Sequence, residues 1–399
     1  MSVRIMHVDL DAFFVEVCRQ RRPELRAVDL LVVGGRRDSR GVVQSASYGA
    51  RKFGVRSGMP IGQAVRLCPD ATFIRGEFAD YRAASVQVRT VLERHAPVVV
   101  MTGLDEGYLD FSGTDLLYPV SLLDVAEGIR NEVRAASELD CSIGIGPNRM
   151  IAKIASDYAK PRGVCEVRSG WERGFLAGLS LAALPGIGPK TATRLAERGL
   201  ETVAQVQRMT AAELAQLIGR EEAMALARRA DGKGGTVLSR QAAPKSVSRE
   251  TTFRRDVTNA AELDRVLLLL TARVASQLRD EGLVAGAVVL KLRHGDFHTV
   301  TRRTTLSAPS ALDGELIAPA RRLLAPAFAA ARERRQGIRL LGIAASSIGP
   351  AESPDLFEAP ERTRARDVSA AVDRIRTRFG FEALGSGRLI DQRKRSDKD

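Results

Sequence analysis

Three acidic residues stand where the sequence predicts that strands end or turn. Asp9 ends a mostly apolar, β-branched run at residues 3–9, and Asp105 and Glu106 lie in a glycine-flanked segment between two further apolar runs. A carboxylate at the end of a strand has a backbone held by the sheet and a side chain that ligands can reach. Carboxylates that meet repel one another unless cations neutralise them, and hard oxygen ligands favour Mg²⁺ or Mn²⁺. Two divalent ions held there would suit in-line phosphoryl transfer. The alternative is that these acids are a hairpin turn and a strand-end cap on a solvated face, and for an isolated Asp-Glu pair that alternative is the more common one.

The elements that must position these acids follow a split βαβ pattern. The sequence predicts strands at residues 3–9, 98–101, 108–111 and 141–146, and helices at residues 79–95, 120–136 and 148–159. This order makes the first strand a neighbour of the later ones. Asp9 is therefore expected to meet Asp105 and Glu106 at one edge of a sheet.

The second half of the chain repeats this pattern after a helical stretch. Residues 170–230 are predicted to be helices with short loops, and residues 231–244 to be a linker. Beyond the linker the sequence predicts strands at residues 246–253, 284–293, 298–306 and 338–348, a helix at residues 259–281 and another that ends near Arg335. We therefore expect an α+β fold of several domains, since 399 residues exceed what one hydrophobic core supports.

The charge of the chain favours polyanionic partners. Its formal net charge is +13 at pH 7, and nucleic acid is the first candidate because phosphate neutralisation supplies much of its affinity for proteins. An anionic membrane surface is the second candidate. The sequence lacks the long apolar run that a spanning helix needs, and its N-terminal run lacks a signal-peptide cleavage pattern. We expect a cytoplasmic protein without a membrane partner.

The cysteines and histidines argue against a metal site built from thiolate or imidazole ligands. Cys18, Cys68, Cys141 and Cys165 are scattered, without CxxC or paired spacing. Such spacing indicates neither a disulfide framework nor a zinc site. The histidines form no HExxH or other ligand pair, so the carboxylates are the candidate metal ligands.

Four segments of the sequence resemble the motifs of Y-family DNA polymerases, in particular the bacterial translesion enzymes of the DinB or DNA polymerase IV type. They are residues 8–14 (VDLDAFF), 47–60 (SYGARKFGVRSGMP), 104–110 (LDEGYLD) and 142–161, which begin SIGIGPNR and end KP. The segments occur in the family's order and at its spacing. Each motif alone is weak, but together they are specific, and the resemblance covers roughly residues 1–350.

The resemblance implies a right-hand architecture. It comprises a split-βαβ palm at residues 1–10 and 77–165, small fingers at 11–76, a helical thumb with a helix-hairpin-helix at 166–232, a linker at 233–244, a β-α-β-β-α-β little finger at 245–350 and a C-terminal tail at 351–399. It also implies primer-template DNA and deoxynucleoside triphosphates as partners of a monomeric enzyme.

The resemblance also assigns roles within the site. Asp9, Asp105 and Glu106 become ligands of two Mg²⁺ ions, with Mn²⁺ as an alternative, and the carbonyl of Leu10 joins one ion. The implied contacts of the triphosphate are Tyr48, Arg51, Lys160, the amides near Phe13 and Phe14, and Ser45. Arginine offers a bidentate fork, lysine a point charge and tyrosine a hydroxyl donor. The ring of Phe14 stands where the family keeps a bulky gate against the 2′ hydroxyl of ribonucleotides.

Further residues are candidates for contact with DNA. Residues 184–192 (LPGIGPKTA) fit a helix-hairpin-helix, in which Gly186 and Gly188 let the backbone approach a phosphate and Lys190 adds charge. In the last domain, basic residues beside predicted strands suggest a basic sheet face on the duplex backbone: Lys245, Arg249, Arg293, Arg302 and Arg303. Leu356 and Phe357 resemble the end of a sliding-clamp peptide, although Ser353 replaces its usual glutamine.

The sequence departs from the family pattern near these motifs. Gly103-Leu104 stands where Ser-Ile is usual, Gly107 replaces a common alanine, Gly49 replaces a common glutamate, and Gln44 lies where a small residue is more usual. These changes spare the carboxylates. They leave open the enzyme's fidelity, rate and lesion preference.

The function expected from these features is error-prone translesion synthesis by two-metal nucleotidyl transfer. One alternative is a metal-dependent nuclease that uses the same carboxylates, but Tyr48, Arg51 and Lys160 argue against it because a nuclease holds no triphosphate. A second alternative is a non-catalytic DNA-binding repair factor, against which the intact acids argue. Primer extension, primer shortening and mere DNA retention distinguish the three.

Overall fold

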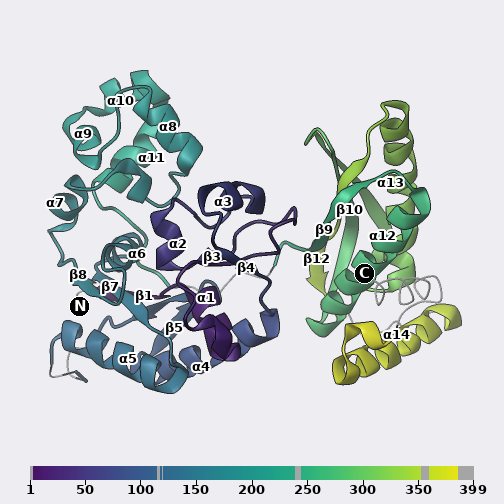
Figure 1. Ribbon diagram of the computed structural model, residues 1–399, viewed down its shortest axis with the longest axis horizontal. Helices are drawn as coiled ribbons and strands as arrows, with labels where there is room; N and C mark the ends of the chain where they lie inside the picture. The colour runs from purple at the N-terminus through teal and green to yellow at the C-terminus, as the bar shows by residue number, and fades with distance from the viewer. Residues whose placement is uncertain (1–2, 115–116, 119, 239–243, 352–358, 385–399) are drawn as a thin grey trace. The chain divides into compact units, whose positions relative to one another are not determined.

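The chain divides into two compact units, Met1–Ala242 and Ala243–Asp399. The computed structural model describes residues 3–114, 117–118, 120–238, 244–351 and 359–384 (Figure 1). Each unit has sheets and buried clusters of its own, as expected for a chain of this length. Within the described residues, the helices are all too short or too polar to span a bilayer.

A sheet in the order β5-β6-β1-β7-β8 forms the centre of the first unit. Its strands are β1 (Ile5–Leu10), β5 (Val98–Met101), β6 (Glu106–Asp110), β7 (Cys141–Gly146) and β8 (Val164–Glu166). Successive residues of a strand face opposite sides. Met6 and Val8 of β1 accordingly pack into the large core beneath α4 (Phe78–His95) and α5 (Leu122–Ser137). Ile5 packs on the other side with Ala152 of α6 (Arg149–Tyr158).

Strand pairing brings the acidic residues together. β1 lies antiparallel between β6 and β7, and its register puts Asp9 opposite Glu106. The amide of Leu10 donates to the carbonyl of Asp105 at 2.8 Å. The end of β1 and the β5–β6 turn are therefore adjacent, although nearly a hundred residues of sequence separate them.

A smaller sheet, in the order β3-β2-β4, lies beside this core. It consists of β2 (Leu31–Val33), β3 (Ser45–Ala46) and β4 (Thr72–Ile74), with α1 (Phe13–Arg21), α2 (Tyr48–Lys52), α3 (Ile61–Leu67) and the 3₁₀ turn η1 (Pro23–Leu25) around it. β3 is only two residues long. A side chain at Gly34 would lie 2.1 Å from the carbonyl oxygen of Val42, so the backbone just after β2 lies in close contact with the backbone just before β3.

Short helices after β8 have a core of their own. They are α7 (Glu172–Ala177), η2 (Leu181–Ala183), α8 (Pro189–Ala196), α9 (Val203–Arg208), α10 (Ala211–Ile218) and α11 (Arg220–Ala230). Capping boxes at Thr202 and Thr210 begin α9 and α10. Gly186 has φ +88°, which favours glycine, and Pro189 begins α8.

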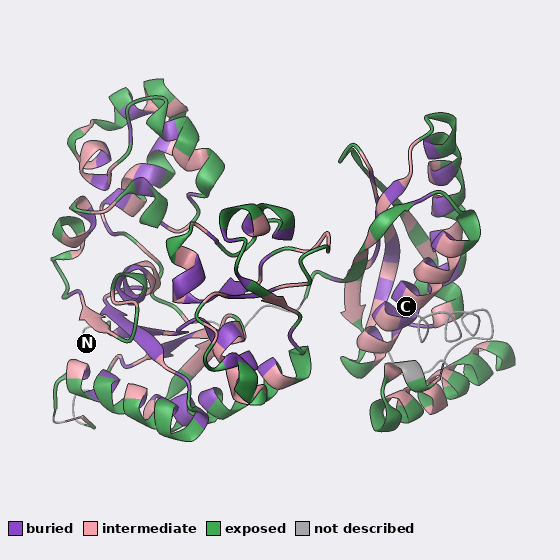
Figure 2. Ribbon diagram, in the orientation of Figure 1, coloured by how far each residue is buried: buried purple, intermediate pink, exposed green. Residues whose placement is uncertain are grey.

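The second unit is a sheet in the order β11-β10-β12-β9 with helices on one face. Its elements are β9 (Ser246–Val257), α12 (Ala260–Asp280), β10 (Leu283–His294), β11 (Thr299–Ser310), α13 (Asp313–Glu333), β12 (Ile338–Pro350), α14 (Pro360–Phe379) and η3 (Phe381–Ala383). Leu263, Leu267 and Leu316 of α12 and α13 pack with Val288 and Leu290 of β10. Residues of β10 are buried or half-buried, whereas most residues of β9 and β11 are exposed (Figure 2).

The expected α+β fold of several domains is confirmed, as is the split pattern of strands and helices in both halves of the chain. The domain boundaries given above stay predictions. Asp373 of α14 pairs with Arg279 of α12 at 2.6 Å. The predicted clamp residues, Leu356 and Phe357, lie outside the described residues.

Candidate active site

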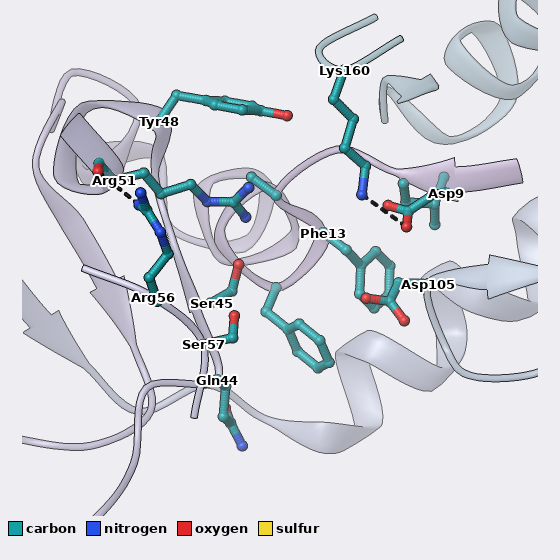
Figure 3. Close-up of a pocket in the computed structure, with 13 residues that line it drawn as sticks. Asp9, Phe13, Gln44, Ser45, Tyr48, Arg51, Arg56, Ser57, Asp105 and Lys160 are labelled. Carbon is teal, nitrogen blue, oxygen red and sulfur yellow. Dashed lines mark hydrogen bonds and ion pairs between the residues drawn. The ribbon is translucent and has the colours of Figure 1, made fainter. Parts of the chain in front are cut away.

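A cavity of about 530 Å³ opens at the end of β1 (Figure 3). Its lining is Asp9, Leu10, Ala12, Phe13, Phe14, Gln44, Ser45, Tyr48, Arg51, Arg56, Ser57, Asp105 and Lys160. Cationic and hydroxyl side chains from α2 and the loops around it lie on one side, and carboxylates from the central sheet lie on the other. The cavity therefore joins the predicted metal ligands Asp9 and Asp105 to the predicted triphosphate contacts.

Asp9 and Asp105 carry negative charge that the protein compensates only in part. The side chain of Asp9 is 14% exposed, and its Oδ2 lies 2.9 Å from Nζ of Lys160. Burial raises the pKa of Asp9 despite this ion pair. Burial also raises the pKa of Asp105, and the neighbouring charge of Asp9 raises it further. A divalent cation between them would relieve both effects, so this pair and the adjacent Leu10 fit the predicted Mg²⁺ site.

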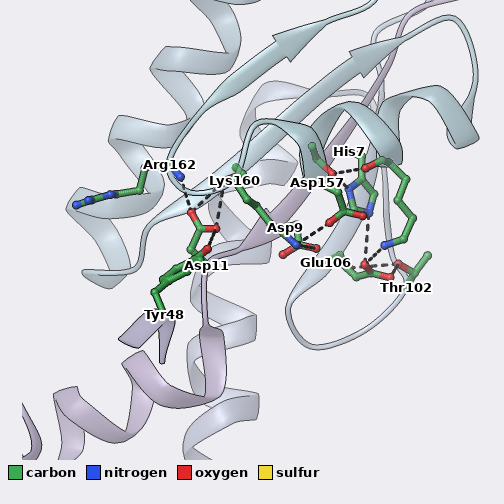
Figure 4. Close-up of polar contacts among 12 residues, drawn as sticks. His7, Asp9, Asp11, Tyr48, Thr102, Glu106, Asp157, Lys160 and Arg162 are labelled. Atoms are coloured by element: carbon green, nitrogen blue, oxygen red, sulfur yellow. Dashed lines mark hydrogen bonds and ion pairs between the residues drawn. The ribbon is translucent and has the colours of Figure 1, made fainter. Parts of the chain in front are cut away.

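Glu106 is directed differently from the other two acids. Asp9 and Asp105 line the cavity, but Glu106 is not among its lining residues in the described part of the chain. Its carboxylate forms an ion pair with Lys153, and Nε2 of the buried His7 lies 3.6 Å from Oε2 (Figure 4). These neighbours lower the pKa of Glu106. In the described part of the chain, no three His, Cys, Asp or Glu side chains form a group that could hold a metal as they stand. The expected convergence of three carboxylates is thus only partly present.

His7 and Lys153 were not singled out from the sequence. His7 is fully buried, and its Nδ1 lies 2.7 Å from the hydroxyl of Ser156 on α6. Lys153 comes from the same helix, one turn earlier. Alternate residues of a strand face the same side, so Ile5, His7 and Asp9 of β1 all face α6. This period of two residues is the sequence signal that places His7 near the acids.

Three side chains from or near α2 bring hydrogen-bond donors to the cavity. Nε of Arg51 donates to the carbonyl of Ala46 at 2.9 Å, and its guanidinium lies 4.9 Å from the centre of the Tyr48 ring. Arg56 donates to the carbonyl of Arg51 at 2.8 Å. These bonds hold the cationic side chains in place, as recognition of a triphosphate requires. Arg56 and Ser57 lie within the fingers motif, yet the motif gave them no role.

The beginning of α1 presents backbone donors to the same space. Ala12 adopts a left-handed conformation (φ +46°) and turns the chain from β1 into the helix. The first amides of a helix have no acceptor within it, so those of Phe13 and Phe14 are available to an anion. Ser45 is 4% exposed and lines the cavity beside them. All three predicted contacts therefore line the cavity, and their contact with phosphate stays a prediction.

The ring of Phe14 is held by an aromatic cluster. It meets Tyr81 edge to face, with ring centroids 4.7 Å apart, and Phe13 at 5.1 Å. Tyr81 is fully buried, and its hydroxyl lies 3.2 Å from the sulfur of Cys18. Edge-to-face contacts of this kind favour one ring orientation. Phe14 therefore presents a fixed wall to the cavity.

Asp11 connects the two sides of the cavity, and the sequence motif alone gave it no role. Its carboxylate is buried and accepts from the Tyr48 hydroxyl at 2.9 Å, the Ser142 hydroxyl at 3.0 Å and the amide of Arg162 at 2.8 Å (Figure 4). Burial and the adjacent Asp11 raise the pKa of Tyr48. The Tyr48 hydroxyl consequently keeps its proton and is the donor in this pair.

The sequence matches known families over most of its length. Residues 8–157 match the impB/mucB/samB family, residues 244–356 its C-terminal domain, and residues 179–229 the SAM-like helix-hairpin-helix tandem. A protein named DNA polymerase IV from Dehalococcoides mccartyi (strain CBDB1) is 38% identical over 390 residues, covering 97% of this chain and 98% of the relative. The chain belongs to the Y family of DNA polymerases. DNA polymerase IV of Caulobacter vibrioides is 35% identical over 98% of this chain and 95% of its own.

Solved structures of Y-family polymerases share the fold. The chimera Dbh-Dpo4(243-245)-Dbh superposes with a TM-score of 0.72 at 25% identity, over 86% of this chain and 99% of the chimera. DinB from Sulfolobus solfataricus gives a TM-score of 0.57 at 24% identity, over 86% of this chain and 98% of its own. The resemblance noted from the motifs is confirmed by both comparisons.

Two departures of this polymerase from the family pattern have local structural reasons. A side chain at Gly49 would lie 2.6 Å from a carboxylate oxygen of Asp29, which occupies the space beside α2. A side chain at Gly107 would lie 2.7 Å from the sulfur of Met101 on the adjacent strand. Glycine at these two positions leaves room for the side chains of Asp29 and Met101. Neither glycine displaces an acid of the site.

The second unit of the polymerase divides its predicted DNA contacts between two faces. Arg293 and Arg303 point away from the helices, and Arg293 donates to Thr299 at 2.9 Å on that open face. Arg302 pairs in register with the buried Leu290 and, on the helix side, lines a cavity of about 250 Å³ beside α13. Arg249 lies opposite the buried Ile343, again on the helix side. The expectation of one basic face is thus wrong for Arg249 and Arg302, because neighbouring strand residues alternate.

The remaining predicted DNA contacts are exposed. Lys245 precedes β9, and Gly186, Gly188 and Lys190 lie at the loop that begins α8. A side chain at Gly188 would meet nothing within 4 Å. That loop can therefore be approached closely by a ligand, and its DNA contact stays a prediction.

Proposed function

We propose that this polymerase extends a DNA primer on a template by two-metal nucleotidyl transfer in the cavity at the end of β1, and that it does so across damaged template bases. The observation that carries the proposal is the pairing of two undercompensated carboxylates with a set of phosphate-binding donors across one cavity. A nuclease needs the first group but has no use for the second. A binding protein needs neither.

The proposed reaction makes and breaks one bond each at the α-phosphorus of a deoxynucleoside triphosphate. The 3′ oxygen of the primer bonds to that phosphorus, its proton leaves to solvent, and the bond to the bridging oxygen breaks to release pyrophosphate. Asp9, Asp105, Glu106 and the carbonyl of Leu10 would hold two Mg²⁺ ions. Bound there, these ions supply charge that activates the 3′ hydroxyl and stabilises the leaving oxygen.

The triphosphate would be held by residues that now make other contacts. Lys160 pairs with Asp9 and with Asp157 at 2.8 Å, which places its ammonium at the cavity wall. Once another cation neutralises Asp9, that ammonium can turn to a phosphate oxygen. Arg51 offers the bidentate fork that suits two phosphate oxygens. The amides that begin α1 and the Ser45 hydroxyl complete the donor set.

The second unit and the helix-hairpin-helix would bind the primer-template duplex. Arg293 and Arg303, with Thr299 and Thr301 between them, form an open strand face suited to phosphates. Gly186, Gly188 and Lys190 offer a second backbone contact. A sliding clamp remains a candidate partner through Leu356 and Phe357.

Primer extension with single nucleotides tests the proposed function. The intact chain is expected to lengthen a primer by the templated nucleotide when Mg²⁺ or Mn²⁺ is present, and chelation should stop it. Asp9→Asn and Asp105→Ala should each reduce incorporation by at least about 100-fold. Asp110→Asn, an acid at the far end of β6, is the matched control and should retain activity. Primer shortening would indicate the nuclease, and DNA retention without reaction would indicate the binding factor.

Damaged templates test the translesion part separately. The ratio of incorporation opposite a lesion to incorporation opposite the undamaged base should be higher than for a replicative polymerase on the same templates. Equal or lower ratios for every lesion tried would reject the translesion role and leave DNA synthesis intact.

A further inference from the structure

A single buried carboxylate ties the two triphosphate-binding sides of the cavity together. Asp11 is 5% exposed. Its Oδ1 accepts from the hydroxyl of Tyr48 on α2, and its Oδ2 accepts from the amide of Arg162, two residues after Lys160. Ser142 of β7 lies between and donates to both oxygens at 3.2 and 3.0 Å. Asp11 thus contacts Tyr48 on one wall of the cavity and the Lys160 segment on the opposite wall.

The position of Asp11 follows from the turn at the end of β1. Its amide donates to the carbonyl of Asp140 at 2.9 Å, and the left-handed Ala12 follows at once. The backbone therefore anchors Asp11 between β7 and the start of α1. The backbone of Asp11 is thus held independently of Tyr48 and Arg162, and its carboxylate can serve as a common acceptor for both.

The Tyr48 hydroxyl has one proton and at present donates it to Asp11. A phosphate oxygen, which only accepts, cannot receive that proton at the same time. Nucleotide binding through this hydroxyl consequently requires the Tyr48 O–H to turn from Asp11 and donate its hydrogen bond to a phosphate oxygen instead. The contact to Asp11 meanwhile keeps the ring and its hydroxyl at the cavity in the absence of nucleotide.

We infer that Asp11 is a positioning residue that prepares Tyr48 and the Lys160 segment for the incoming triphosphate, and that the Tyr48 hydroxyl exchanges Asp11 for a phosphate oxygen on binding. This inference rests on the proposed function of the cavity. It predicts that Asp11 acts on nucleotide affinity more than on the chemical step. Without the carboxylate, the Tyr48 ring and the Lys160 segment are no longer held at the cavity before nucleotide binds. We expect this loss of preorganisation to outweigh the one hydrogen bond that binding breaks, and to weaken nucleotide binding about tenfold.

A double-mutant cycle on nucleotide binding tests the inference. The variants are Asp11→Asn, Tyr48→Phe and their combination, in the full chain bound to a primer-template whose primer ends in a dideoxynucleotide. The correct deoxynucleoside triphosphate is titrated, and steady-state KM and kcat are measured on an extendable primer. Asp140→Asn is the matched control, since it changes a carboxylate beside the same turn but leaves the backbone carbonyl that Asp11 uses.

The expected result is a rise of about tenfold in Kd and KM for Asp11→Asn, with kcat changed less than about threefold. In the Tyr48→Phe background the same change should have an effect of about threefold or less, because its target hydroxyl is gone. Equal effects in both backgrounds would overturn the inference, as would a fall in kcat with KM unchanged. A residue with only a structural role has no reason to give this non-additive result.

The folding of Asp11→Asn is checked by thermal denaturation. If that variant does not fold, Ser142→Ala decides, because it weakens the same carboxylate contact without removing its charge. A raised nucleotide Kd for Ser142→Ala supports the inference, and an unchanged one overturns it. The titration needs no synthesis, so it also tests Asp11 if the wild-type chain extends no primer, which would contradict only the proposed function.

Discussion

Lys153 and Lys160 each neutralise one acid of the candidate metal site. Lys160 pairs with Asp9, and Lys153 pairs with Glu106. Burial lowers the pKa of both lysines, but the adjacent carboxylates outweigh it and raise the pKa overall, so both are charged. These ammonium groups compete with a divalent ion for the same oxygens. Lys160 has a second proposed role at the triphosphate, whereas Lys153 lies on α6 and contacts Glu106.

Removing Lys153 should therefore tighten the binding of Mg²⁺. For Lys153→Met we expect the Mg²⁺ concentration at half-maximal primer extension to fall several-fold, because Glu106 loses its competing cation. Extension is measured against Mg²⁺ at saturating nucleotide. Lys52→Met, an exposed lysine of α2, is the control. A higher Mg²⁺ requirement for Lys153→Met would instead mean that this lysine holds Glu106 ready for the metal.

Phe14 should exclude ribonucleotides, because its ring cannot move away from a 2′ hydroxyl without breaking its contacts with Tyr81 and Phe13. Phe14→Ala is expected to raise the efficiency of ribonucleotide insertion relative to deoxynucleotide insertion by on the order of 100-fold. Single-nucleotide kcat/KM values with both sugars measure this. Phe53→Ala removes a phenylalanine that is 52% exposed and should leave the ratio unchanged. Unaltered sugar selectivity in Phe14→Ala would reject the gate.

At the level of elements, the alternation along β11 decides which arginines can touch DNA. Arg303 should contribute to phosphate binding and Arg302 should not. For Arg303→Ala, the slope of log binding constant against log salt is expected to become shallower by about one, while Arg302→Ala keeps the wild-type slope. Fluorescence anisotropy of a labelled primer-template over a range of salt concentrations measures both. A shallower slope for Arg302→Ala alone would place the DNA on the helix side.

These two arginines also show where prediction from sequence reaches its limit. The neighbours of β1 followed from the split βαβ order, which put Asp9 beside Asp105 and Glu106. In the predicted strand at residues 298–306 the apolar residues are Val300 and Leu306, and alternation puts both on the same side as Arg302, which is a weak signal from two residues. Pairing with the buried Leu290 in β10 shows that this side faces the helices.

The candidate site divides in the same way. Asp9, Asp105, Tyr48, Arg51 and Lys160 were predicted from motifs and line one cavity. Contacts between distant side chains had no such signal. Glu106 follows Asp105 in sequence, yet His7 and Lys153 turn its carboxylate elsewhere, and Asp11 meets Arg162 across 151 residues. Such contacts depend on tertiary packing, which a local pattern does not contain.

At the scale of the whole molecule, catalysis and DNA affinity should be separable. The candidate active site lies entirely within Met1–Ala242, and the open strand face lies entirely within Ala243–Asp399, each unit with its own core. Residues 1–242 alone should insert a nucleotide at saturating DNA with kcat close to that of the full chain. Their affinity for DNA should fall about tenfold or more, because the phosphate contacts of the second unit are lost. Circular dichroism establishes folding, and extension is measured against DNA concentration. A folded fragment that inserts no nucleotide at any DNA concentration would mean that the second unit supplies part of the active site itself.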